Sequence, residues 1–233
     1  MIALVLIAAL LIPSTPTSAT GAPKWTSAMV GNASKVWGTP YIVGGLHRYG
    51  KYNRHFDSYL PVTVKGVYYP GFKAMASSIP RGSWVLYDIE RWPWTPLIEQ
   101  QHPLGYMKRF TDLAHRYGLK VILAPGPSLC GVWAGCTRNP RSYVSTLIKG
   151  AYDAGGDIVN LMLLSWQCNP SVYAYGARLA RSYVPRWKLV AEQWTKGPPP
   201  SRSHFGKCSW STLQTSWSAA KPYVSGRWVG WWG

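Results

Sequence analysis

The stretch WVLYDIERWPW, Trp84 to Trp94, places two carboxylates two positions apart at the end of an apolar run. A continuous apolar run without polar alternation is typical of a parallel strand that is covered on both faces. Similar short runs recur along the chain, at residues 41–45, 62–67, 120–124, 158–164, 188–192 and 228–231. We therefore predict seven parallel strands.

Amphipathic helices are expected between these strands. Residues 106–117 carry their apolar side chains on one helical stripe and end at Gly118, and residues 144–151 repeat this pattern before Gly155. Alternating strands and helices indicate an α/β fold. No glycine-rich phosphate loop follows the first strand, which removes the main support for a dinucleotide-binding sheet. We expect a small or irregular (β/α)8-type barrel, with an open doubly wound sheet as the alternative.

The N-terminus has the pattern of an export signal. Residues 2–12 are apolar but too few to span a bilayer, and small residues follow up to Gly21. We predict a signal peptide over residues 1–21 and a single domain over residues 22–233, with a retained N-terminal anchor as the alternative. The mature protein is then secreted and extracellular, and no later apolar run is long enough to cross a membrane.

Four cysteines fit an exported protein with two disulfides, which can be paired in three ways. Cys130 and Cys136 are close enough in sequence to close one loop, and Cys168 and Cys208 then remain for each other. The absence of any CxxC pair argues against a zinc site. We expect neither a metal nor a cofactor.

The charge balance is strongly basic. Lys and Arg number 25 against 8 Asp and Glu, which gives a net charge of +17, and the basic residues are scattered. Such a surface attracts polyanions, although charge of this kind also serves solubility alone. Fourteen tryptophans add flat faces that suit both cores and stacking on sugars. We expect a polysaccharide or an anionic polymer of a cell envelope as the partner, and no specific nucleic acid.

The carboxyl ends of the expected strands carry the polar residues. In a barrel this end is the working face. Asp88 and Glu90 point the same way if the strand continues through Glu90, and two carboxylates that close cannot both ionise freely. A carboxyl with a raised pKa suits a general acid near neutral pH. The alternative is structural: Asp88 caps the following turn and Glu90 pairs with Arg91 or another cation.

The D-I-E at residues 88–90 resembles the D-x-E signature of two families of glycosidase barrels, the chitinases and the barrel-type lysozymes. The resemblance implies that Glu90 donates a proton to the glycosidic oxygen and that Asp88 orients the substrate. The first expected strand, residues 41–45, lacks the aspartate of the lysozymes. The chain is also similar to a group of exported actinobacterial barrels of unassigned role, which share the pattern Y-D-x-E-x-W, T-P, E-Q found here between Tyr87 and Gln100.

These observations favour an exported glycoside hydrolase-like protein that acts on an envelope or extracellular polysaccharide. Glu90 is the expected proton donor, Asp88 orients substrate or stabilises the transition state, and Glu192 is the nucleophile or base. The expected sugar-binding residues are Trp92, Trp94, Gln167, Gln193, Trp194 and Trp231. Trp92 and Trp94 could equally cover the barrel mouth by packing. The alternative function is a non-catalytic, cationic, Trp-rich binder of anionic polymers, and a nuclease lacks the clustered acids of a two-metal site.

Overall fold

The computed structural model describes most of the chain from residue 84 onward and short segments before it. The described residues are 41–43, 62–65, 69, 72–73, 76–79, 81–82, 84–91, 95–196 and 202–231. The predicted signal peptide, residues 1–21, lies outside them, and so do Trp92 and Trp94.

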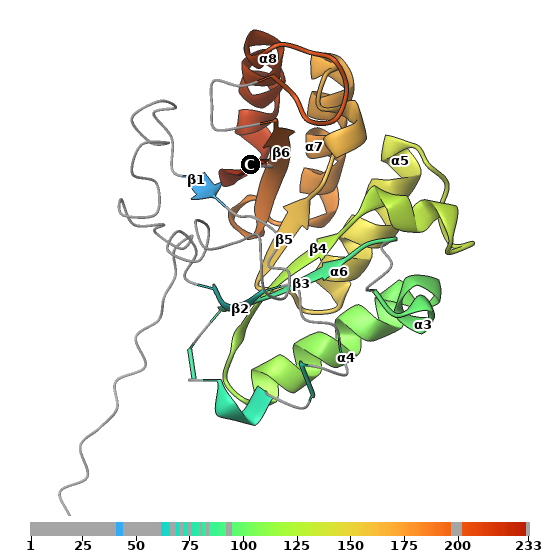
Figure 1. The fold of residues 1–233 in the computed structure, drawn as a ribbon, viewed down its shortest axis with the longest axis vertical. Helices are drawn as coiled ribbons and strands as arrows, with labels where there is room; N and C mark the ends of the chain where they lie inside the picture. The colour runs from blue at the N-terminus through green and yellow to red at the C-terminus, as the bar shows by residue number, and fades with distance from the viewer. Residues whose placement is uncertain are drawn as a thin grey trace, which may run out of the picture.

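Seven parallel strands form one sheet in the described part of the chain (Figure 1). They are β1 (Tyr41–Val43), β2 (Val62–Lys65), β3 (Trp84–Ile89), β4 (Lys120–Pro125), β5 (Ile158–Leu161), β6 (Leu189–Thr195) and β7 (Gly226–Trp231). This confirms the predicted parallel α/β class, and each strand overlaps one of the predicted runs.

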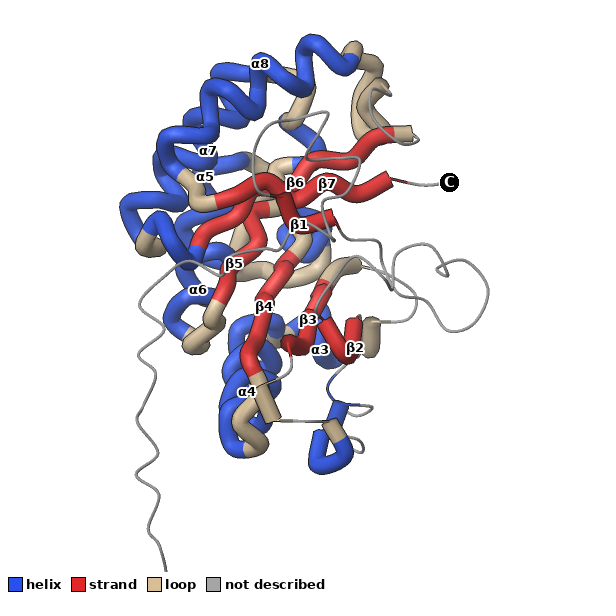
Figure 2. Tube along the Cα trace, turned by 90° about the vertical axis from the view of Figure 1, so that its left-hand side faces the viewer, coloured by secondary structure: helices blue, strands red, loops and turns tan. Residues whose placement is uncertain are grey.

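The strand order follows the chain. Neighbouring strands are β2, β3, β4, β5, β6 and β7, and β1 lies beside β7. Among the described residues no ladder joins β1 to β2, so these two strands are the edges of the sheet. Helices α4 to α8 all lie along one face of the sheet (Figure 2). An open doubly wound sheet differs in both respects, because its strand order reverses at a switch point and helices cover both faces.

The helices connect successive strands, and the sequence marks where they begin. They are α3 (Leu97–Gln101), α4 (Pro103–Arg116), α5 (Pro140–Tyr143), α6 (Lys149–Asp153), α7 (Pro170–Tyr183) and α8 (Trp210–Ala220), with a π-helical segment, Val144–Ile148, between α5 and α6. An Asn-Pro pair opens both α5 and α7: Asn139 accepts a hydrogen bond from the Ser142 N–H, and Asn169 accepts one from the Val172 N–H. Asn is a favoured N-cap and Pro suits the first helical position, since the N–H it lacks would be unpaired there. No helix among the described residues is long and apolar enough to cross a membrane.

The main core lies between the sheet and these helices. Val85, Tyr87 and Ile89 of β3 are completely buried in it. The ring of Tyr87 stacks on Phe110 of α4, with 4.4 Å between the ring centres. Since side chains alternate along a strand, Asp88 points to the opposite face of the sheet, away from the helices.

Two disulfides brace loops at the carboxyl ends of the strands. Cys130 pairs with Cys136 in the segment that follows β4, with 4.8 Å between the Cα atoms. Cys168 pairs with Cys208, with 5.5 Å between the Cα atoms, and so joins the segment after β5 to the start of α8. These are the two pairs favoured by the sequence spacing.

Candidate functional site

Three of the eight acidic residues of the chain meet at one face of the sheet. Asp88 belongs to β3, Glu90 follows that strand directly, and Glu192 belongs to β6. Their exposed fractions are 4%, 8% and 3%, respectively. The structure therefore brings together the three carboxylates that the sequence selected.

Asp88 is buried close to both of the other carboxylates. Burial raises the pKa of Asp88 well above its usual value, and the nearby charges of Glu90 and Glu192 raise it further. Two buried oxygens, Asp88 Oδ1 and Asn160 Oδ1, have no hydrogen-bond partner among the described residues. Buried polar atoms are rarely unpaired, and those that are need a specific explanation such as a catalytic role. Burial and the neighbouring negative charges thus favour the protonated form of Asp88.

Glu192 is held by side chains of its own and the adjacent strand. Its Oε2 accepts a hydrogen bond from the Asn160 amide, and its Oε1 accepts one from the indole N–H of Trp194. Burial raises the pKa of Glu192 to about 7, although these two hydrogen bonds act in the opposite direction. Both oxygens of Glu192 therefore contact the protein interior.

Glu90 lies against the loop that follows β4. The Ser128 hydroxyl donates a hydrogen bond to Glu90 Oε2 over 3.3 Å, and the same hydroxyl accepts one from the Arg91 N–H at 3.0 Å. A Cβ atom at Gly126 would lie 2.4 Å from Glu90 Cγ and 2.5 Å from Oε2. The Glu90 carboxyl thus rests directly on the backbone of Gly126, where only glycine leaves room.

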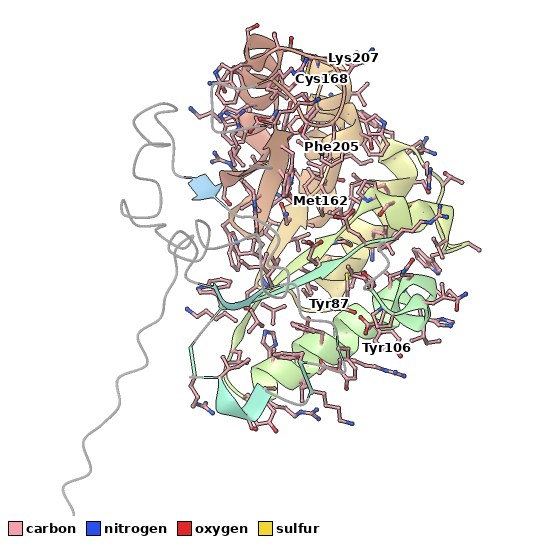
Figure 3. The ribbon with its side chains drawn as sticks, in the orientation of Figure 1. Tyr87, Tyr106, Met162, Cys168, Phe205 and Lys207 are labelled. Atoms are coloured by element: carbon pink, nitrogen blue, oxygen red, sulfur yellow. A yellow bond between two sulfur atoms is a disulfide. The ribbon has the colours of Figure 1, made fainter. Side chains whose placement is uncertain are left out.

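Glu90 also lines a hollow of about 330 Å³ at the carboxyl ends of the strands. Its polar lining includes Ser128, Arg138 and Ser165, and its aromatic lining is Trp166 and Phe205. Cys168 and Phe205, which belong to the disulfide-braced loops, are labelled in Figure 3. A hollow with few polar groups and aromatic walls is the usual form of a small-ligand site.

Tyr143 joins the ends of two strands near Glu192 and Glu90. Its hydroxyl donates a hydrogen bond to the Pro125 carbonyl at 2.9 Å and accepts one from the Met162 N–H at 3.0 Å. Burial raises the pKa of Tyr143, and the nearby Glu192 and Glu90 raise it as well. The phenol stays neutral and fixes the distance between β4 and β5.

Two of the predicted sugar-binding residues are completely buried and hydrogen-bonded to the protein. The Gln167 amide donates to the Trp194 carbonyl at 2.9 Å, and its oxygen accepts from the Trp194 N–H at 2.9 Å. The Gln193 amide donates to the Leu213 carbonyl at 3.0 Å, and its oxygen accepts from Arg227. These contacts join β6 to neighbouring segments.

The predicted tryptophans are placed differently from one another. Trp194 is 5% exposed and contacts Glu192 rather than the hollow. Trp231 is placed only as the last residue of β7. Trp92 and Trp94 lie outside the described residues.

Sequence reasoning missed Ser128, Arg138, Asn160, Trp166 and Phe205. Asn160 gave a usable signal, since it is a lone polar residue within the apolar run of β5. Trp166 stands next to the predicted Gln167, in a 3-10 turn (Leu164–Trp166) whose orientation the sequence does not reveal. Arg138 and Phe205 reach the hollow from loops that the disulfides position.

The pattern Y-D-x-E-x-W, T-P, E-Q has a structural basis outside the hollow. The Tyr87 hydroxyl donates a hydrogen bond of 2.5 Å to Glu99, which is fully buried, and the Gln100 amide donates to the Thr95 carbonyl at 2.7 Å. The first bond attaches α3 to β3, and the second holds Thr95 against α3. Burial raises the pKa of Glu99.

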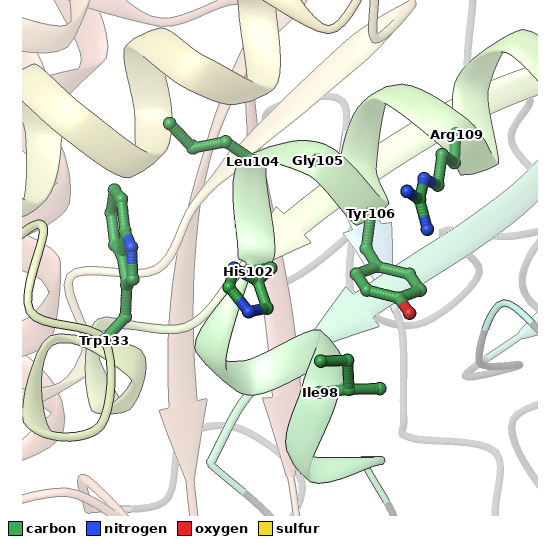
Figure 4. A pocket seen from close by; sticks show the side chains of 7 residues that line it. All are labelled: Ile98, His102, Leu104, Gly105, Tyr106, Arg109 and Trp133. Atoms are coloured by element: carbon green, nitrogen blue, oxygen red, sulfur yellow. The ribbon is translucent and has the colours of Figure 1, made fainter.

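A second hollow, of about 480 Å³, lies on the helical side of the molecule (Figure 4). It is bordered by Ile98 of α3, by His102, which follows α3, by Leu104 and Arg109 of α4, and by Trp133 in the segment after β4. Its lining is mainly apolar and contains no carboxylate. Within the described segments, no group of three or more His, Cys, Asp or Glu side chains is arranged to hold a metal ion.

No protein-family model matches the sequence, and no curated protein matches it. Among solved structures, the chain is similar to a hydroxymethylglutaryl-CoA lyase from Pseudomonas aeruginosa, with a TM-score of 0.48 and 13% identity over 72% of this chain and 51% of the lyase. It is also similar to a GH18 chitinase from Pseudoalteromonas aurantia, with a TM-score of 0.44 and 12% identity over 64% of this chain and 56% of the chitinase. The chain thus spans about half the length of these proteins. At such scores and identities the likenesses do not assign the chain to a family.

Proposed function

We propose that this protein is an exported glycoside hydrolase-like enzyme that cleaves an envelope or extracellular polysaccharide by carboxylate acid–base catalysis. One observation carries the proposal: Glu90 lines an open, aromatic-walled hollow, and Asp88, which has a raised pKa, lies close to both Glu90 and Glu192, whose pKa is also raised. Clustered carboxyls of this kind keep a proton available near neutral pH.

In the proposed mechanism Glu90 gives its proton to the glycosidic oxygen as the bond to the anomeric carbon breaks. A water molecule then adds to the anomeric carbon and releases a proton, which returns to Glu90 and restores the acid. Trp166 and Phe205 offer flat faces for the sugar rings. Asp88, two positions before Glu90 and on the same side of the sheet, orients the substrate or stabilises the positive charge that develops on the sugar. We assign Glu192 to the support of Asp88, because both Glu192 oxygens are bonded within the protein.

We further propose that the sheet belongs to a closed (β/α) barrel and that the protein works outside the cell. The order of strands, with β1 beside β7, is the cyclic order that a barrel requires. Both disulfides are typical of proteins that fold in oxidising compartments.

The substitution Glu90→Gln tests the enzymatic proposal. Release of reducing ends should be measured on a panel of soluble glycans that includes peptidoglycan fragments, chitin oligosaccharides and acidic polysaccharides. Loss of a general acid should lower kcat by about 10²–10⁴-fold on any glycan that the wild-type protein cleaves. Asp153→Asn is the matched control, since it removes one negative charge from the exposed surface. Undiminished hydrolysis by the Glu90→Gln variant, or no hydrolysis by the wild-type protein, would overturn the proposal.

The net charge of +17 supports a second candidate, a non-catalytic binder of anionic polymers. A binder of this kind should retain its affinity after Glu90→Gln. Its affinity should fall steeply with added salt, because each neutralised anion releases counterions on binding. Co-sedimentation with anionic cell-wall polymers over a series of salt concentrations measures this dependence.

A further inference from the structure

We propose that the hollow beside Glu90 binds a negatively charged substituent on the glycan, and that Arg138 is the residue that binds it. The substrate class is thereby narrowed to acidic glycans, which carry carboxylate, sulfate or phosphate groups. The position of this substituent next to the cleaved bond rests on the proposed function. The binding of an acidic group by Arg138 can be tested independently of that function.

Arg138 and Glu90 line the same hollow of about 330 Å³. With Ser128, Ser165 and the two aromatic rings, the lining contains one cation, hydroxyl groups and flat apolar faces. A guanidinium presents several N–H donors in one plane, which matches carboxylate, sulfate and phosphate oxygens bidentately. A neutral sugar offers no counter-charge to it.

Arg138 has no acidic partner among the described residues. The described acids outside the site contact other groups: Asp112 pairs with Lys108, Asp153 with Lys149, Asp157 with His115, and Glu99 binds Tyr87. The guanidinium of Arg138 is therefore available to a ligand.

The backbone around Arg138 is fixed before any ligand arrives. The Cys130–Cys136 disulfide closes the loop before it, and the Thr137 N–H donates to the Ser142 hydroxyl at 2.9 Å. Asn139, the next residue along, caps α5. A pre-ordered binding group loses less conformational entropy when it binds, which favours affinity.

The Arg138 guanidinium lies against the backbone of Gly131, in space that a side chain at Gly131 would occupy. A Cβ atom at Gly131 would come within 2.3 Å of Arg138 Nη2 and 2.8 Å of Cζ. These atoms are at the end of a flexible side chain, so Gly131→Ala should displace the guanidinium without unfolding the loop. This variant moves the charge, whereas Arg138→Ala removes it.

Isothermal titration calorimetry in the catalytically silent Glu90→Gln background tests the proposal. The probes are an oligogalacturonate, a sulfated chondroitin oligosaccharide and a teichoic acid fragment, each paired with its neutralised form: methyl-esterified, desulfated and carboxyl-reduced, or dephosphorylated. At least one acidic probe should bind about 10–100-fold more tightly than its neutral form, as expected for charge-assisted hydrogen bonds. Arg138→Ala and Gly131→Ala should both abolish this preference. The identity of the preferred probe distinguishes carboxylate, sulfate and phosphate.

Arg141→Ala is the matched control, because Arg141 is an exposed cation three residues away that does not line the hollow. It should retain the preference for acidic probes. Equal losses in the Arg138 and Arg141 variants would show attraction by overall charge and overturn the proposal, as would binding of no probe or equal binding of acidic and neutral forms. Selective binding without hydrolysis by the wild-type protein would instead retain Arg138 and remove the proposed enzymatic activity.

Discussion

Glu90 and Gly126 are in direct contact although they follow different strands. The Gly126 N–H donates a hydrogen bond to the Ile89 carbonyl at 2.8 Å, which brings the loop after β4 against the end of β3. The Glu90 side chain then lies over the Cα atom of Gly126. The Glu90 carboxyl can therefore occupy this position in the hollow only because Gly126 has no side chain.

Gly126→Ala should displace the Glu90 carboxyl while the protein remains folded. The backbone of Gly126 is extended, with φ −75° and ψ 144°, so alanine is compatible with it, and the three atoms nearest to the added methyl group all belong to the Glu90 side chain. We expect hydrolysis to fall about 10²-fold, as for a misplaced catalytic group, with little change in the melting temperature. Initial rates and calorimetry measure the two effects.

Gly105→Ala is the control for this substitution. Gly105 lies within α4, and a Cβ atom there has no neighbour within 4 Å. Alanine at this position should raise stability by up to about 1 kcal/mol and leave hydrolysis unchanged. A Gly126→Ala variant as active as Gly105→Ala would contradict the assigned position of Glu90.

Strand alternation explains which site residues the sequence could predict. Asp88 and Glu90 share a face because they are two positions apart, and Trp194 contacts Glu192 for the same reason. Gln193 lies between Glu192 and Trp194 and therefore points to the helices, so the same rule, applied consistently, would have predicted its burial. Gln167 follows a 3-10 turn, where no such rule operates.

At the scale of elements, strands were predictable because buried parallel strands are continuous apolar runs. Loops were not, since their course depends on contacts between distant segments. Phe205 reaches the hollow from a loop held by the Cys168–Cys208 disulfide and by the Ser203 N–H, which donates to the Cys208 carbonyl at 3.1 Å. The spacing of the cysteines indicated their pairing but not the residues that the pairing brings together.

The two disulfides should contribute unequally to stability. Cys168 and Cys208 are 40 positions apart and Cys130 and Cys136 only 6, and a longer closed loop restricts the unfolded chain more. Replacing Cys168 and Cys208 by serine should cost about 4 kcal/mol, against about 2 kcal/mol for the shorter pair, by loop-entropy arithmetic. Denaturant unfolding of both double variants measures the difference. A larger loss for the shorter pair would show that native-state contacts outweigh loop length.

Over the whole molecule, the scarce negative charge is concentrated. Seven of the eight acids are described; three form the site, Glu99 is buried, Asp112 and Asp153 pair with lysines, and Asp157 contacts His115. The cations far exceed these acids in number, so long-range attraction of polyanions is a property of the entire surface. The proposed binding of an acidic substituent by Arg138 acts in addition to this long-range attraction.

The buried carboxyls should make stability depend on pH. The folded-state pKa of Glu192 is about 7 against 4.5 for the ordinary group, so the folded protein binds the proton more tightly. The stabilisation is complete below about pH 4.5 and is lost as the pH rises through about 7. Asp88 acts in the same direction.

Urea unfolding between pH 4 and 8 checks this dependence when wild type is compared with Glu192→Gln. The stability of wild type relative to the variant should decline across the window by an amount on the order of 3 kcal/mol. Taking the difference cancels the change in overall charge repulsion, which both proteins share. A wild-type advantage that grows with pH would show that Glu192 is stabilised as a carboxylate.

The π-helical segment Val144–Ile148 directly follows Tyr143, whose hydroxyl joins the ends of β4 and β5. A π turn winds more residues into each revolution than an α turn, so it shifts the angular phase of everything before it relative to everything after it. If these five residues wound as an ordinary α-helix, each would turn further around the axis, and Tyr143 would point in a different direction relative to α6. Its phenol would then leave Pro125 and Met162, and the ends of β4 and β5 would lose the side chain that joins them.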